Sequence, residues 1–188
     1  MATPVVTTAS DVELLEALRS GDEAAFALLH ERYRPFTRRI ALRLLGDAHE
    51  AEDVCQEVFL RLFRHPPQLE GPNALRLWFA RVTTNTALNA LRSRRRARFH
   101  WIRWFHLEWL PRPRAGEDDE RAETAVLVRS VLEQLSERDR ALLALRATGL
   151  SYQEIASTLG IRQRSLGTLL ARAERRFRQR YEALVRAE

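Results

Sequence analysis

Apolar residues recur at spacings of three and four along most of the chain, a pattern typical of amphipathic helices. The pattern predicts helices over 11–18, 23–45, 48–63 and 74–96, separated by Gly, Asp or Pro residues that interrupt helices. The periodicity fades near residue 97 and returns at about residue 123. No run alternates in the way that predicts a β-strand. The sequence therefore predicts an all-α fold.

The interruption divides the chain into two small helical domains. The predicted boundaries are a flexible N-terminus at 1–10, a first domain at 11–97, a linker at 98–122 and a second domain at 123–188. Asp11, Asp22 and Ser136 stand where helices should begin, and each can accept hydrogen bonds from free backbone N–H groups. The residues predicted to face the core from the third and fourth helices are Ala51, Val54, Cys55, Val58, Phe59, Leu62, Leu77, Trp78, Val82, Leu88 and Leu91.

The clearest local motif lies between Leu150 and Ala173. Ser151 and Glu154 have the spacing of a capping box, which begins a helix, and Gly160 ends that helix because glycine tolerates the left-handed conformation. An Arg-rich helix follows after two or three residues. This order predicts a helix–turn–helix whose second helix enters the major groove of DNA. A helical hairpin with a solvated basic face is the alternative interpretation.

The distribution of charge favours the DNA-binding interpretation. The 31 basic residues are all Arg, the formal net charge is +6, and the pI is about 10.7. Arg residues concentrate at 92–114 and 162–180, with an acidic stretch at 117–120 between these segments. Because neutralisation of phosphates is a main source of nucleic-acid affinity, two basic segments predict two contacts with a nucleic acid.

Several classes of protein are excluded by what the chain lacks. A single cysteine, Cys55, rules out an internal disulfide framework and a cysteine-based zinc site, and its apolar neighbours predict a packed thiol in preference to a redox sensor. The five His residues are scattered without metal-ligand spacing, so we expect no metal and no cofactor. The first ten residues do not resemble a signal peptide and no apolar run matches a membrane span, so the expected location is cytoplasmic.

Two further segments, read with the helix–turn–helix, carry a family resemblance. Residues 51–62 read AEDVCQEVFLRL, and residues 77–92 read LWFARVTTNTALNALR. Their order and spacing resemble the polymerase-binding helix and the promoter-melting segment of bacterial RNA polymerase sigma factors, and residues 135–173 resemble the second conserved domain of that family. Two domains with nothing substantial between them resemble the extracytoplasmic-function (ECF) group.

The resemblance implies a promoter-recognition subunit that is not an enzyme. The partners it implies are core RNA polymerase, promoter DNA and an anti-sigma protein, with no small-molecule substrate. A stand-alone helix–turn–helix regulator is the competing function, but such a regulator needs neither segment within 51–92. An enzyme is disfavoured because no cluster of residues suits catalysis.

On the helix at 48–63, one polar face is implied to bind the coiled-coil clamp of the largest polymerase subunit. Its residues are Asp53, Gln56, Glu57, Leu60, Arg61 and Phe63. Acidic residues suit an Arg-rich partner, because charge-assisted hydrogen bonds are strong. A merely solvated face is the alternative.

The helix at 74–96 carries a polar ridge of Arg81, Asn85 and Asn89, and Arg92 follows at the same helical spacing. Asn can pair with base edges and Arg with phosphates. The resemblance implies that this ridge and the loop at 66–73 engage the non-template strand of the minus-ten element and hold a base flipped from the stack. The implied residues are Trp78, Arg81, Asn85, Asn89, Arg92 and Arg95, although Trp78 also suits the core. The family often has Asp where Asn89 stands, so the base contacts of this chain should differ.

The second helix of the helix–turn–helix is implied to read the minus-thirty-five element. The residues are Arg162, Gln163, Arg164, Ser165, Thr168 and Arg172, and Arg175, Arg176 and Arg178 follow toward phosphates or solvent. Where the family typically has Gly-Thr-Val-Lys-Ser-Arg, this chain has RSLGTL at 164–169, which predicts a different promoter preference. Gly167 costs about 1 kcal/mol inside a helix relative to Ala, and it would permit close approach of the backbone to DNA.

The predicted linker is unusually aromatic. Residues 98–110 contain three Trp and two Phe. Three interpretations are open: a continuation of the preceding helix that packs between the domains, a docking surface for an anti-sigma protein or polymerase, or a segment that lies on a membrane surface. By resemblance, the Pro-rich acidic stretch that follows would thread toward the active-site and RNA-exit channels of the polymerase.

Overall fold

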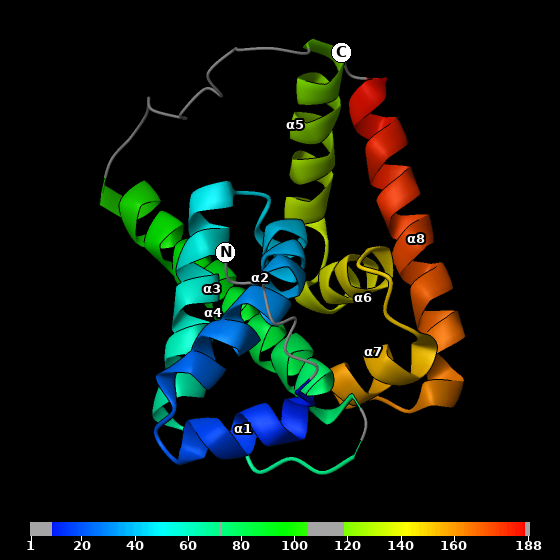
Figure 1. Ribbon diagram of the computed structural model, residues 1–188. Coiled ribbons are helices and arrows are strands. Elements are labelled where there is room, and N and C mark those ends of the chain that lie inside the picture. The colour runs from blue at the N-terminus through cyan, green and yellow to red at the C-terminus, as the bar shows by residue number, and fades with distance from the viewer. Residues whose placement is uncertain (1–8, 72, 105–118, 187–188) are drawn as a thin grey trace.

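The computed structural model describes residues 9–71, 73–104 and 119–186. Every regular element within these residues is a helix, which confirms the all-α prediction. The helices are α1 (Asp11–Arg19), α2 (Glu23–Leu45), α3 (Ala48–Arg64), α4 (Ala74–Trp104), α5 (Asp119–Gln134), α6 (Glu137–Ala147), α7 (Tyr152–Leu159) and α8 (Gln163–Val185). Figure 1 shows α1–α4 gathered on one side of the molecule and α5–α8 on the other.

The start of α1 corrects one prediction. Its N-cap is Ser10 and not Asp11, because Ser10 and Glu13 form a reciprocal capping box. The carboxylate of Asp11 accepts hydrogen bonds from Arg32, at 2.7 Å, and from the hydroxyl of Tyr33 instead. Asp11 therefore ties α1 to α2. The caps predicted at Asp22, Ser136 and Ser151 are confirmed.

Two helices are longer than the sequence pattern predicts. Helix α4 continues past residue 96 to Trp104, because neither Gly nor Pro occurs between 97 and 104 to stop it. Helix α5 begins at Asp119 and not near residue 123, and acidic residues in a first turn favour a helix N-terminus. Part of the aromatic segment is thus a continuation of α4. Residues 105–118 lie outside the described part, so the packing of the segment stays a prediction.

The core of the first domain forms where α2, α3 and α4 meet. All the inward residues predicted for α3 are buried. On α4, Val82 and Leu91 are buried as predicted, whereas Leu77, Trp78 and Leu88 are half-buried. The sequence analysis missed Phe79, which is fully buried and lies at the centre of the packing: its ring stacks on Tyr33 at 4.5 Å and meets Phe59 at 5.2 Å.

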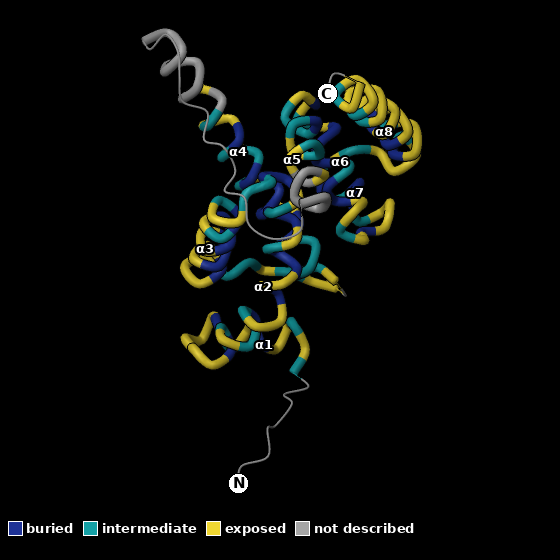
Figure 2. Tube along the Cα trace, turned by 90° about the horizontal axis from the view of Figure 1, so that it is seen from above, coloured by how far each residue is buried: buried dark blue, intermediate teal, exposed yellow. Residues whose placement is uncertain are grey.

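The two halves of the molecule pack against each other. Helix α7 lies against α4, and α6 lies against α2. The buried apolar residues of both halves form one continuous cluster, to which the second half contributes Leu142, Leu145, Ile155, Leu166 and Leu170. In Figure 2, α4 runs between α3 and the group formed by α5–α8. No helix in the described ranges is long and apolar enough to cross a membrane.

The turn between α2 and α3 contains a glycine that lies against α5 and an aspartate that caps α3. Gly46 adopts φ 71°, the left-handed conformation that favours glycine, and a Cβ at this position would lie 3.1 Å from Nε of Arg129 on α5. The next residue, Asp47, caps α3 by accepting the backbone N–H groups of His49 at 2.9 Å and Glu50 at 3.0 Å. The hydrogen bond from Glu50, with that from His49, lowers the pKa of Asp47 against the opposing effect of burial.

We predict that Asp47→Ala lowers the free energy of unfolding by about 1 kcal/mol at pH 7, because two N–H groups of α3 lose their acceptor. A carboxyl whose pKa is lowered by folding stabilises the fold fully at a pH above its pKa in the unfolded chain, which is about 3.9. This stabilisation is lost as the pH falls through the lower pKa of the folded state. The difference between Asp47→Ala and the parent should therefore shrink in acid. Urea denaturation followed by circular dichroism, at pH 7 and again in acid, measures the free energy of unfolding of both proteins.

Asp53→Ala is the matched control, because Asp53 is an exposed carboxylate in the middle of the same helix and caps nothing. Its effect should stay within about 0.5 kcal/mol. Equal losses from the two substitutions would contradict the capping role of Asp47.

Candidate functional sites

The outward face of α3 gathers the first set of predicted residues. Asp53, Gln56, Glu57, Leu60, Arg61 and Phe63 are all exposed, whereas the opposite face of the helix is buried. Two large apolar side chains stand among the polar ones: Leu60 is 50% exposed and Phe63 is 46% exposed. Phe63 is supported from below by Phe26, whose ring meets it edge-on at 5.2 Å. Two exposed apolar side chains among amide, acidic and basic groups make a surface suited to another protein.

The α4 ridge, formed by Arg81, Asn85, Asn89 and Arg92, is the second set. All four side chains are exposed, because the opposite side of α4 is held in the core by Phe79. Trp78 is half-buried and meets the ring of Phe79 edge-on at 5.1 Å, so it belongs mainly to the packing. Arg95 lies on α4, but its side chain falls outside the described part of the structure.

Arginines of α4 also contact the second half of the molecule, which the sequence analysis did not foresee. Within the ridge, Arg81 donates to the backbone oxygen of Ser157 at 2.9 Å, and Arg92 pairs with Glu137 at 2.7 Å. The hydrogen bond and charge of Glu137 raise the pKa of Arg92. Arg81 and Ser157 lie 76 residues apart in the chain, and Arg92 and Glu137 lie 45 residues apart. Helical spacing therefore carries no signal for these contacts.

Two more arginines of α4 extend this contact beyond the predicted site. Arg76 pairs with Glu154 of α7, and its guanidinium lies 4.7 Å from the ring centre of Phe36. Arg94 pairs with Glu133 of α5 at 3.0 Å and with Glu50 of α3 at 3.2 Å. Arg94 thereby links three helices.

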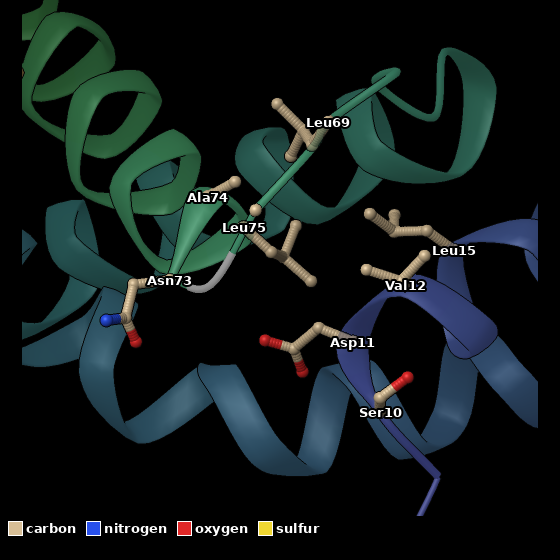
Figure 3. A pocket seen from close by; sticks show the side chains of 9 residues that line it. Ser10, Asp11, Val12, Leu15, Leu69, Asn73, Ala74 and Leu75 are labelled. Atoms are coloured by element: carbon tan, nitrogen blue, oxygen red, sulfur yellow. The ribbon is translucent and has the colours of Figure 1, made fainter.

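A pocket of about 250 Å³ lies between the start of α1, the loop before α4 and the first turn of α4 (Figure 3). Figure 3 shows Ser10, Asp11 and Asn73 on its polar side, facing Val12, Leu15, Leu69 and Leu75. Asp11 is held in place by its bonds to Arg32 and Tyr33, and burial together with the neighbouring carboxylate raises the pKa of Tyr33. The loop before α4 is part of the 66–73 segment for which the resemblance implies a contact with the minus-ten element. The presence of Asp11 beside this loop is not predicted by the sequence pattern, which indicates a helix cap at that residue.

The helix–turn–helix has the predicted geometry. Ser151 and Glu154 form the capping box of α7, and Gly160 ends this helix at φ 64°. Leu166, Leu170 and Ala173 anchor α8 in the core. Of the six residues predicted on its outward face, Arg162, Gln163, Arg164, Thr168 and Arg172 are exposed and Ser165 is half-buried.

Farther along α8, one arginine makes a contact that the sequence analysis did not predict. Arg176 is exposed, as predicted, but it also pairs at 2.8 Å with Asp139, whose side chain is 8% exposed. Arg176 therefore fixes α8 to α6. Cys55 is buried as predicted, and burial raises the pKa of its thiol to about 11. Among the described residues, no three His, Cys, Asp or Glu side chains are grouped to hold a metal ion.

Comparison with known proteins identifies the family. The Sigma-70 region 2 family matches residues 29–97, and the Sigma-70 region 4 family matches residues 125–177. The RNA polymerase sigma-H factor of Pseudomonas aeruginosa is 34% identical over 97% of this chain and 96% of its own length. The ECF RNA polymerase sigma factor SigL of Mycobacterium tuberculosis is 30% identical over 85% of this chain and 90% of its length. The chain belongs to the ECF group of sigma factors.

The ECF sigma factor SigE of Mycolicibacterium smegmatis is 33% identical over 89% of this chain, which spans 65% of that relative. Two solved structures share the fold: CnrH in complex with the cytosolic domain of CnrY, with a TM-score of 0.62, and RpoE in complex with the anti-sigma factor NepR from Bartonella quintana, with a TM-score of 0.61. Each is 21% identical, and they cover 95% and 84% of this sigma factor. Its function is to bind core RNA polymerase, recognise promoter elements and promote strand opening.

Two glycines of the helix–turn–helix should respond in opposite ways to substitution by Ala. Gly160→Ala places a Cβ in a left-handed conformation, so we expect a loss of about 1 kcal/mol in the free energy of unfolding. Gly167→Ala lies inside α8, where the nearest side-chain atom to a new Cβ is 3.9 Å away in Tyr152. We expect it to gain about 0.5–1 kcal/mol, because the unfolded chain loses freedom.

Urea denaturation of the two variants measures both effects. If the backbone at Gly167 approaches DNA closely, Gly167→Ala should also weaken binding to minus-thirty-five duplex while stabilising the protein. A stabilised variant with unchanged duplex binding would contradict the close approach, and equal destabilisation by both substitutions would contradict the assigned backbone conformations.

Proposed function

We propose that the three exposed faces of this sigma factor divide its work. The outward face of α3 binds the clamp of core RNA polymerase, the α4 ridge binds the non-template strand of the minus-ten element, and the start of α8 reads the minus-thirty-five element. The observation that carries the proposal is the exposure of the α4 ridge on a helix whose opposite face is fully buried. Asn85 and Asn89, at the centre of the ridge, are thereby accessible to a partner.

The pocket beside the loop is the proposed receptacle for a flipped base. Its volume of about 250 Å³ is ample for one base, and its walls are largely apolar, as stacking requires. The carboxylate of Asp11 retains acceptor capacity beside its two bonds, and Asn73 offers an amide at the rim. Carboxylates accept from exocyclic amines, so the pocket favours cytosine or adenine over thymine.

The start of α8 supports duplex reading. Gln163, Arg164 and Thr168 project from the first turns of the helix, and Arg and Gln are the side chains that pair bidentately with guanine and adenine. Arg162 precedes the helix as its N-cap and makes no capping hydrogen bond through its side chain, so its guanidinium can reach a phosphate. The protein acts where polymerase and DNA are, in the cytoplasm, and it has no chemistry of its own.

An anti-sigma protein is the proposed inhibitor. The solved relatives, CnrH and RpoE, were found in complexes with CnrY and with the anti-sigma factor NepR. In this chain an apolar groove of about 650 Å³ runs between α2, α5, α6 and α8, lined by Leu42, Val128, Leu132, Leu143 and Phe177 among others. An amphipathic helix fits such a groove. We expect native protein from uninduced cells to co-purify with a stoichiometric partner, and purification without one would contradict this proposal.

Polymerase binding tests the face of α3 directly. We predict that Asp53→Ala/Gln56→Ala weakens binding to core RNA polymerase by at least about tenfold, because two polar groups of the partner lose their hydrogen bonds. Titration of core enzyme with fluorescently labelled protein measures the affinity. The stability of the double variant should match that of the parent, because both side chains are exposed.

Gln179→Ala/Glu182→Ala is the matched control. It truncates an exposed amide and an exposed carboxylate at the same spacing of three residues on α8. We expect this control to bind core enzyme like the parent. Equal loss in both double variants, or none in Asp53→Ala/Gln56→Ala, would remove the α3 face from the polymerase interface.

A further inference from the structure

Four arginines on α4 each meet an electronegative group of the second domain, the part formed by α5–α8. The pairs are Arg76 with Glu154, Arg81 with the backbone oxygen of Ser157, Arg92 with Glu137 and Arg94 with Glu133. They span 19 residues of α4, from Arg76 to Arg94, and involve α7, α6 and α5 in turn. Two of these arginines, Arg81 and Arg92, belong to the α4 ridge.

The partners share the chemistry of a phosphate group. Three are carboxylates, which bind guanidinium through the same charge-assisted hydrogen bonds as phosphate oxygens. The fourth, the carbonyl of Ser157, lies in the last turn of α7, at the negative end of the helix dipole. Glu154 is favoured as an anion: burial works to raise its pKa, but the hydrogen bonds from Ser151 and the charge of Arg76 lower it overall.

We infer that the second domain substitutes for the DNA backbone on α4, so that the free protein and single-stranded promoter DNA compete for the same arginines. The inference rests on the proposed function, because it requires that α4 binds DNA. An arginine bonded to Glu137 or Glu133 cannot neutralise a phosphate until that bond breaks. The second domain must therefore leave α4, at least locally, before the minus-ten strand is held.

The second domain takes the place of DNA only at the arginines that would bind phosphates. Asn85 and Asn89 are exposed, and so are Gln163, Arg164 and Thr168 at the start of α8. The closed arrangement thus leaves the side chains for reading duplex DNA accessible while engaging the arginines for holding a single strand. We therefore expect the free protein to bind single-stranded DNA weakly. Its affinity should rise when the carboxylates are neutralised.

The test replaces three carboxylates by their neutral isosteres in Glu133→Gln/Glu137→Gln/Glu154→Gln. Gln at residue 154 keeps the capping box of α7, because a capping box accepts Glu or Gln at this position. The control, Glu16→Gln/Glu31→Gln/Glu182→Gln, removes three exposed carboxylates elsewhere and changes the net charge equally. Should the triple variant fail to fold, Glu137→Gln alone serves, because the carboxylate of Glu137 is at the protein surface near the exposed Arg92.

Two measurements on the full chain give the result. Fluorescence anisotropy with a labelled single-stranded DNA of mixed sequence should show the triple variant binding on the order of tenfold more tightly than the control. The slope of log affinity against log salt should steepen by about 1.4, since Arg76 and Arg92 are freed, Arg94 keeps its pair with Glu50, and each phosphate contact on a single strand adds about 0.7. Small-angle X-ray scattering without DNA should show a larger radius of gyration for the triple variant alone.

Equal affinity, equal salt slope and equal radius of gyration in the two triple variants would overturn the inference. Asn85→Ala distinguishes this failure from a failure of the proposed function, because Asn85 is on the α4 ridge but outside the four pairs. In holoenzyme, Asn85→Ala should slow strand opening and leave initial duplex binding unchanged. If strand opening is unaffected by Asn85→Ala, the assignment of α4 to the minus-ten strand is wrong, whatever the triple variants show.

Discussion

Burial of one face of α4 is the constraint on which both halves of the molecule depend. Phe79 is fully buried between Tyr33 and Phe59, so α4 cannot rotate about its axis without opening the core of the first domain. Consecutive helical residues are turned by 100°, and a slip of one position would carry the α4 ridge into the core. The same aromatic packing that stabilises the domain therefore fixes the direction of Asn85 and Asn89.

Fixing α4 also fixes where its arginines can reach. Arg76 and Arg94 lie at the two ends of the contact with the second domain, on the side of the helix that turns toward α5 and α7. Arg94 is bonded to α3 as well as to α5, and Arg129 of α5 lies over Gly46 at the end of α2. The interface is thus built from the chemistry of one helix and a few arginines around it, together with the apolar cluster that both halves share.

Local signals in the sequence predicted local structure well. The capping box at Ser151 and Glu154, the left-handed Gly160 and the buried stripe of α3 each depend on residues within one or two turns of one another. At α1 two local signals compete: Asp11 suits a cap, but Ser10 and Glu13 have the capping-box spacing, and the reciprocal pair forms the cap. The end of α4 was misplaced because aromatic composition suggested a linker where no residue breaks the helix.

Contacts between distant segments could not be read from spacing. Asp11 finds Arg32 and Tyr33 on another helix, and Arg92 finds Glu137 across 45 residues; neither partner lies at a helical interval. The position of Phe79 at the centre of the core depends on how three helices meet, which an amphipathic pattern on one helix does not specify. The roles of the exposed faces likewise depend on partners that the chain does not contain.

The position of the α3 face limits how polymerase could release the α4 arginines. In Figure 2, α3 lies on the side of α4 away from α5–α8, and its outward face is exposed while the second domain is seated on α4. A ligand with equal affinity for two states shifts nothing between them, however tightly it binds. Under the proposed role of α3, a partner that binds this face equally well in both arrangements does not open the molecule. Opening requires contacts that only the separated arrangement can make, such as DNA phosphates on α4 or a second polymerase contact by α5–α8. Because partly exposed ion pairs are individually weak and are screened by salt, such contacts need to supply little differential affinity at each arginine.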